Sequence, residues 1–189
     1  MKRIIAIALF GAASANATDI AKDLPKVADI SVNGLELCLD IDEIAAKIGS
    51  RPHRNENLDE LDFHADFANQ KRTQVWSLIG HPGSAETDFE LLVRRAGKDD
   101  VKLVALPVAG FTSGKGVHLG MTSAQLTAIF GAGSVTKNQA VTTIAYTIDP
   151  FQFPWNEEFG HRCGFPGYAA EYQFVGGKLE KFRFGSPNP

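Results

Sequence analysis

The stretch GLELCLDIDEIAAKIG (residues 34–49) aligns without a gap with GVHLGMTSAQLTAIFG (residues 116–131). The glycines at both ends match, and so does the apolar pattern between them. Each copy has a short extended segment, a polar N-cap at Asp40 or Thr122, one amphipathic helix, and a glycine at which the helix stops. The alignment predicts that the chain contains two diverged copies of one small module.

Three β-strands are predicted after each helix. They cover residues 75–79, 89–93 and 101–106 in the first copy, and residues 143–148, 169–175 and 179–184 in the second. Turns at Gly97–Asp100 and at Gly176-Gly177 join the second and third strands of each copy. One such antiparallel meander buries too little apolar surface by itself, so the two should form one larger sheet. The expected fold class is therefore α+β: two tandem copies of a helix and a three-stranded antiparallel meander, with the helices on one face.

The strands of the two copies differ in their faces. The second copy alternates between an apolar face (Ile144, Tyr146, Ile148, Tyr172, Phe174, Phe182, Phe184) and a polar one (Thr143, Thr147, Glu171, Gln173, Lys181, Arg183). In the first copy both faces are apolar in places, as in Val75-Trp76. We expect the second apolar face to be covered by the other copy, by residues 51–74, or by a partner.

The second copy resembles small exported modules of two kinds. The resemblance rests on residues 116–122, on Ile129-Phe130-Gly131, and on a late strand pair around Gly-Gly-Lys-Leu (residues 176–179). One kind is the small lipoprotein of the outer-membrane β-barrel assembly machinery; the other is the β-lactamase inhibitory protein, which carries two such modules in tandem. The chain departs from both, because it has no lipidated cysteine and has two cysteines rather than one bridge per copy. The resemblance implies an exported module that binds another protein.

The first 17 residues have the pattern of a cleavable signal peptide. A positive start, Met1-Lys2-Arg3, precedes an apolar run over residues 4–13 and the small residues of Ala15-Asn16-Ala17. That run is about ten residues, where a membrane span needs about 20, and no later stretch comes closer. We expect a signal peptide over 1–17, a first module over 18–109, a second over 110–189, no transmembrane segment, and a periplasmic or secreted location.

Charge and cysteine content restrict the partners further. Cleavage after Ala17 would remove two basic residues and no acid, which changes the formal net charge from −3 to −5 and argues against a nucleic-acid partner. The two cysteines, Cys38 and Cys163, would meet an oxidising compartment, where a disulfide between them is the default. The alternatives are a catalytic thiol, which needs a paired histidine, and a metal site, which needs more ligands at short spacing.

Few residues suggest catalysis or metal binding. The segment Asp62–Phe67 alternates, so an extended backbone would place Asp62, His64 and Asp66 on one face, where they could hold a divalent metal. An edge strand with a polar outer face gives the same pattern. The glycine-rich residues 110–116 lack the spacing of a phosphate-binding loop and are better explained as a linker between copies. We therefore expect no catalytic residue and no cofactor.

The loop over residues 149–168 is the most informative difference between the copies. Its counterpart in the first copy covers only residues 81–88. Long loops without secondary structure are usually functional or disordered, and the aromatic content here argues against disorder. The predicted partner-binding residues are Phe151, Phe153, Trp155, Phe159 and Phe165. The alternative is that these rings cover an open end of the core.

These observations lead to a functional hypothesis. The chain is expected to be an exported protein-binding module, of the inhibitor or immunity type, that recognises another envelope or secreted protein with its free sheet face and the aromatic loop. An envelope assembly or scaffold factor is the alternative within the same class. A different class, an exported enzyme or metal-binding protein, would use Asp62, His64 and Asp66. The sequence leaves the oligomeric state open.

Overall fold

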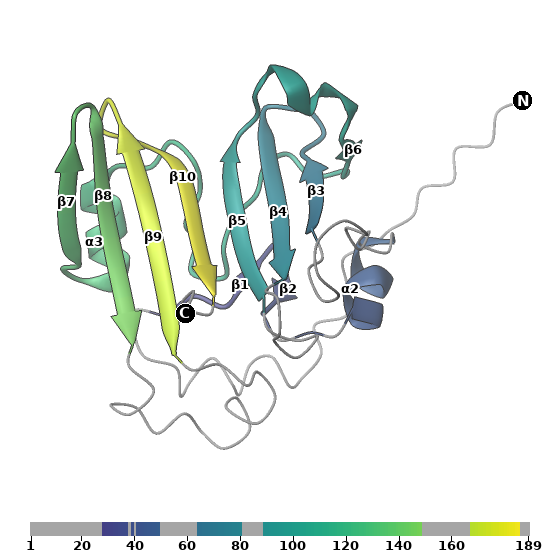
Figure 1. Ribbon diagram of the computed structural model, residues 1–189, viewed down its shortest axis with the longest axis horizontal. Helices are drawn as coiled ribbons and strands as arrows, with labels where there is room; N and C mark the ends of the chain where they lie inside the picture. Colours follow the sequence, from purple (N-terminus) through teal and green to yellow (C-terminus); the bar gives the residue numbers. More distant parts are fainter. Residues whose placement is uncertain are drawn as a thin grey trace, which may run out of the picture.

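The computed structural model describes residues 28–37, 39, 41–49, 64–80, 89–148 and 167–185. Figure 1 shows these residues arranged around one large β-sheet, with α3 behind β8 in that view. The eight strands of this sheet have the order β6-β3-β4-β5-β10-β9-β8-β7. The first half of the chain therefore forms one side of the sheet, the second half forms the other, and the halves meet at β5 and β10.

The strand bounds follow the chain. They are β3 (His64–Ala68), β4 (Gln74–Gly80), β5 (Phe89–Arg95), β6 (Val104–Ala105), β7 (Ser134–Asn138), β8 (Val141–Ile148), β9 (Tyr168–Val175) and β10 (Lys178–Gly185). All neighbours pair antiparallel except β3 and β6, which are parallel. A separate two-stranded sheet joins β1 (Ser31–Val32) to β2 (Leu35–Glu36).

The helices are α2 (Ile41–Ile48), α3 (Ser123–Phe130) and the short 3₁₀ helix η1 (Lys98–Lys102). Local signals fix both ends of α3. The Thr122 hydroxyl accepts from the main-chain N–H of Gln125, whose side chain in turn accepts from the Thr122 N–H at 2.8 Å. Gly131 follows the helix with a φ of +89°, a conformation that glycine adopts without strain.

The core lies on the face of the sheet that α3 packs against. The register aligns one buried row across six strands: Phe67, Trp76, Val93, Phe182, Tyr172 and Ile144. Phe130 of α3 contacts Tyr146 and Tyr172 from above, at ring-centroid distances of 5.4 and 5.5 Å. Rings at these separations gain specific aromatic contacts in addition to burial.

The fold class predicted from the sequence is wrong. The described residues are mostly sheet, with only two α-helices, and the sheet is mixed rather than built from two helix-plus-three-strand antiparallel repeats. In the second half a fourth strand, β7, follows α3 in the sequence, precedes the predicted meander and forms an edge of the sheet. In the first half β3 precedes the predicted strands, and its alternating pattern is that of a strand within the sheet.

The third strand of the first copy is also different from the prediction. Residues 101–106 were expected to pair with β5, but β10 occupies that side of β5. The chain instead forms η1 and crosses to the far side of β3, where only Val104–Ala105 pair, in parallel. Competition for one strand edge therefore decides the topology here.

Several predictions concern residues outside the described ranges. These are the signal peptide over 1–17, the pair Cys38 and Cys163, Asp62, the side chain of His64, and the aromatic residues Phe151, Phe153, Trp155, Phe159 and Phe165. Within the described ranges, no helix is both long and apolar enough to cross a membrane.

Candidate functional site

The sheet face opposite the core carries the candidate site, and we call it the open face. Two neighbouring rows cross it at the junction of the halves: Leu92, Arg183, Glu171 and Ala145 in one, and Arg94, Lys181, Gln173 and Thr143 in the other. All eight residues are half-buried. The polar face predicted for the second copy thus continues onto β5 of the first half.

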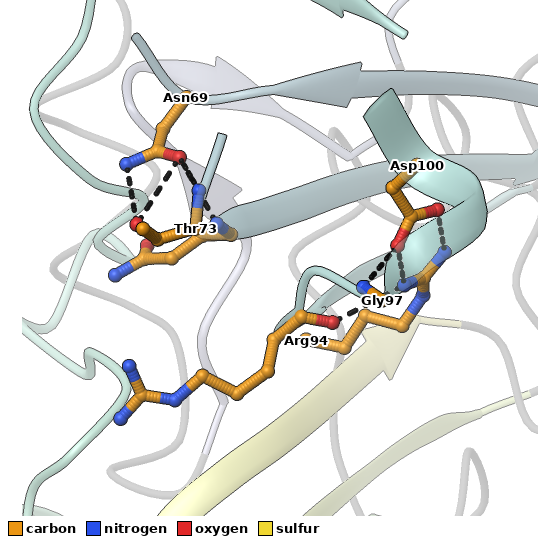
Figure 2. Close-up of polar contacts among 7 residues, drawn as sticks. Asn69, Thr73, Arg94, Gly97 and Asp100 are labelled. Carbon is orange, nitrogen blue, oxygen red and sulfur yellow. Dashed lines mark hydrogen bonds and ion pairs between the residues drawn. The ribbon is translucent and has the colours of Figure 1, made fainter. Parts of the chain in front are cut away.

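Two ion pairs hold charged side chains in place on the open face. Arg183 Nε donates to Glu171 Oε2 at 3.0 Å between β10 and β9. Arg94 makes a two-pronged contact with Asp100, through Nη1 at 2.7 Å and Nη2 at 2.9 Å, as Figure 2 shows. Lys181, between Arg94 and Gln173 in its row, has no ion-pair partner within the described part of the chain. Among the described residues the face therefore offers two arginines paired with carboxylates and one ammonium group without an ion-pair partner.

The electrostatics of Asp100 follow from its contacts. Hydrogen bonds from Arg94, and one from the Gly97 main-chain N–H at 2.5 Å, lower the pKa of its carboxyl to about 2. The same pair raises the pKa of Arg94, to which the nearby Asp66 adds. Two-pronged arginine–carboxylate contacts are stronger and more directional than single ones. Asp100 therefore fixes the position of a guanidinium on the open face.

The crossing from β5 to β6 closes one end of the open face. Arg72 Nη1 donates to the Leu103 carbonyl at 2.7 Å, and Asp100 of η1 contacts Arg94 of β5. At this end Ala68 and Val75, which face the same side as Arg94, are fully buried. The crossing is not among the covers that the sequence predicts for the second apolar face of the first copy, which are the other copy, residues 51–74 or a partner.

The turn between β3 and β4 is held by one buried amide. Asn69 Oδ1 accepts from the main-chain N–H groups of Thr73 at 2.8 Å and Gln74 at 3.0 Å, as Figure 2 shows in part. Its Nδ2 donates to the Ala109 carbonyl at 2.7 Å. Asn69 thus joins the turn to the segment that links the halves, which is a structural role.

A buried polar cluster lies on the core side of the molecule. The Ser113 hydroxyl donates to Asp29, and the Lys115 main-chain N–H also donates to that carboxylate, at 3.2 Å. The Asp29 N–H donates to the Tyr168 hydroxyl at 2.9 Å. Burial raises the pKa of the Asp29 carboxyl, which these hydrogen bonds oppose. Because Ser113 Oγ also accepts from Val117 N–H and is buried, the cluster joins segments rather than forming a nucleophile.

One of the three residues of the metal hypothesis, Asp66, is close to an arginine. Asp66 lies on β3 beside Ser77, near Arg94, so a guanidinium already serves as its neighbouring cation. Among the described residues no group of three or more histidine, cysteine, aspartate or glutamate side chains is arranged to hold a metal ion.

Sequence reasoning found the polar face of the second half but missed Arg94 and Asp100. Neither residue lies in a motif, and Asp100 was assigned to a turn. Their short separation along the chain next to a strand end is the one signal that could have indicated the pair.

Comparisons of the chain with protein-family models, with curated proteins and with solved structures found no match.

Proposed function

We propose that this chain is an exported protein-binding module that recognises another envelope or secreted protein with its open face. The observation that carries the proposal is the strip of half-buried charged side chains across the junction of β5 and β10. Its two arginines are paired with carboxylates of the same chain, Arg94 by two contacts and Arg183 by one. Arginine is enriched among the residues that dominate binding energies at protein interfaces.

The geometry of the strip favours a protein over a small ligand. The charged residues are spread over β5, β10 and β9 on one sheet surface, and a small ligand needs a concave site that encloses most of its surface. Side chains held in one conformation before binding lower the entropy lost on association. Alternating positive and negative groups also select partners by charge complementarity.

The aromatic residues of the long loop extend the proposal. Phe151, Phe153, Trp155, Phe159 and Phe165 stay predicted partner-binding residues, and the described part of the open face has no aromatic side chain of its own. The scaffold alternative differs only in what the partner does.

Affinity capture from envelope and secreted fractions, followed by binding measurements with the purified partner, tests the proposal. Lys181→Glu reverses the free charge on the open face, and we expect it to weaken binding by about tenfold or more. Lys178→Glu is the matched control, because Lys178 is an exposed residue at the hairpin end of the same strand. Equal affinity of the wild-type protein and Lys181→Glu for every captured partner would exclude the open face as the binding surface.

A further inference from the structure

Strand β7 forms one edge of the sheet. Its five residues, Ser134–Asn138, pair with β8 on one side, and no described residue pairs with them on the other. All five are exposed, including Val135 at 56%. The free side of β7 is thus a row of main-chain donors and acceptors available to another strand.

Proteins usually protect such an edge, and β7 has little of that protection. Edge strands are commonly very short, carry lysine or other charged side chains, or are interrupted by proline or a β-bulge, and of these protections β7 has only Lys137. The opposite edge, β6, follows this rule with only two residues. In contrast, β7 contains neither proline nor glycine and pairs with β8 without a register shift.

The base of β7 is also firmly placed. A Cβ atom at Gly133 would lie 2.8 Å from the Ala145 carbonyl oxygen, so the backbone there approaches β8 more closely than any other residue type would allow. The edge is therefore a regular, well-positioned strand.

We propose that β7 pairs antiparallel with β7 of a second copy of this chain, around a twofold axis at Thr136. If the twofold axis is perpendicular to the sheet, one residue of β7 has to lie directly opposite the same residue of the second copy. Centred on Thr136, it pairs all five residues: Ser134 with Asn138, Val135 with Lys137, and Thr136 with Thr136. Threonine pairs across strands are favourable, and the one charged residue of the strand, Lys137, faces a valine.

The neighbouring registers are worse. An axis at Lys137 places two ammonium groups opposite each other, which destabilises a strand pair. An axis at Val135 brings Lys137 opposite Gly133, which lies outside β7, so fewer residues of the strand can pair. Charge and ladder length therefore select the same register.

The twofold axis keeps the corresponding faces of both sheets on the same side. The two open faces would form one continuous surface, so the dimer would present two copies of the charged strip side by side. The pairing itself does not depend on the proposed function, because it uses only the edge. A single strand pair is a small contact, and we expect a dissociation constant between about 1 µM and 1 mM.

Sedimentation equilibrium of the full mature chain over that concentration range tests the pairing. Wild-type protein should show a monomer–dimer equilibrium. Thr136→Lys places charges opposite each other at the axis and should leave only monomer. The matched control is Thr147→Lys, on β8 beyond the end of β7, which should dimerise as the wild type does.

A cross-linking variant identifies the register. Thr136→Cys should form an intermolecular disulfide under mild oxidation, because directly opposed residues of antiparallel strands lie within disulfide range. Wild-type protein treated in the same way controls for the native cysteines. Monomer at every concentration, a dimer that Thr136→Lys does not change, or a dimer without the Thr136→Cys cross-link would each overturn the proposal.

Discussion

Replacement of Asp100 by alanine tests how strongly the crossing over the open face is held. The change removes both hydrogen bonds from Arg94 and the one from the Gly97 N–H. The pKa of Asp100 falls from 3.8 to about 2 in the folded protein. A shift of that size corresponds to about 2.4 kcal/mol if all of it contributed to stability.

Solvent screening lowers the expected effect. The Asp100 side chain is 13% exposed and the Arg94 side chain 32% exposed, so the pair is only partly shielded from water. Partly exposed pairs contribute less than their pKa shifts suggest, and we expect the Asp100→Ala protein to lose about 1 to 1.5 kcal/mol of unfolding free energy at pH 7.

The pH dependence has a definite sign. Because the folded-state pKa lies below the unfolded value, the stabilisation is fully present above pH 3.8 and is lost as the pH falls toward 2. Urea denaturation at several pH values measures this. Asp99→Ala, a neighbouring exposed acid, is the control. A loss below about 0.3 kcal/mol at pH 7, or a difference that persists unchanged at pH 2, would refute the reasoning.

Two further predictions concern the second half of the sheet. Gly133→Ala should lower the free energy of unfolding by about 1 to 3 kcal/mol, measured by thermal or urea denaturation, because the added methyl group would meet the Ala145 carbonyl oxygen at 2.8 Å. Gly97→Ala is the control, because the nearest atom to its added methyl group would be 3.5 Å away. Tyr146→Phe should cost about 1 kcal/mol, because it removes a 2.8 Å hydrogen bond to the Gly131 carbonyl. Tyr172→Phe should cost less, because the buried Tyr172 hydroxyl lies beside the Tyr168 hydroxyl but makes no hydrogen bond of good geometry within the described part of the chain; equal losses would contradict this difference.

Elements with local signals were predictable from the sequence. The cap at Thr122 and the stop at Gly131 locate α3 within one residue of its observed ends. The Gly176-Gly177 turn, where both residues have positive φ, joins β9 to β10 as predicted. In each case the information lies within a few residues of the element, so no knowledge of the partner strand is needed.

Elements decided by distant parts of the chain were not predictable. Strand β7 is exposed along its whole length, so it lacks the apolar alternation by which strands are recognised. The pairing of β6 with β3 depends on β10 having occupied the edge of β5. The same limit applies to Asp29 and Ser113, whose hydrogen bond joins segments 84 residues apart without a motif in either.

The charged strip is formed by residues of both halves of the chain, so binding to it is coupled to the pairing of the halves. Leu92 and Arg94 come from β5, and Lys181 and Arg183 come from β10, so the strip exists only where the two halves are paired. On the other face the same junction buries Val93 against Phe182, and at its end Arg95 Nε contacts Glu180 Oε2 at 2.8 Å. The contacts that hold the halves together therefore lie directly opposite or beside the proposed binding residues. Because neither half alone carries the whole strip, a partner that binds it stabilises the joined sheet over any state in which the halves have separated.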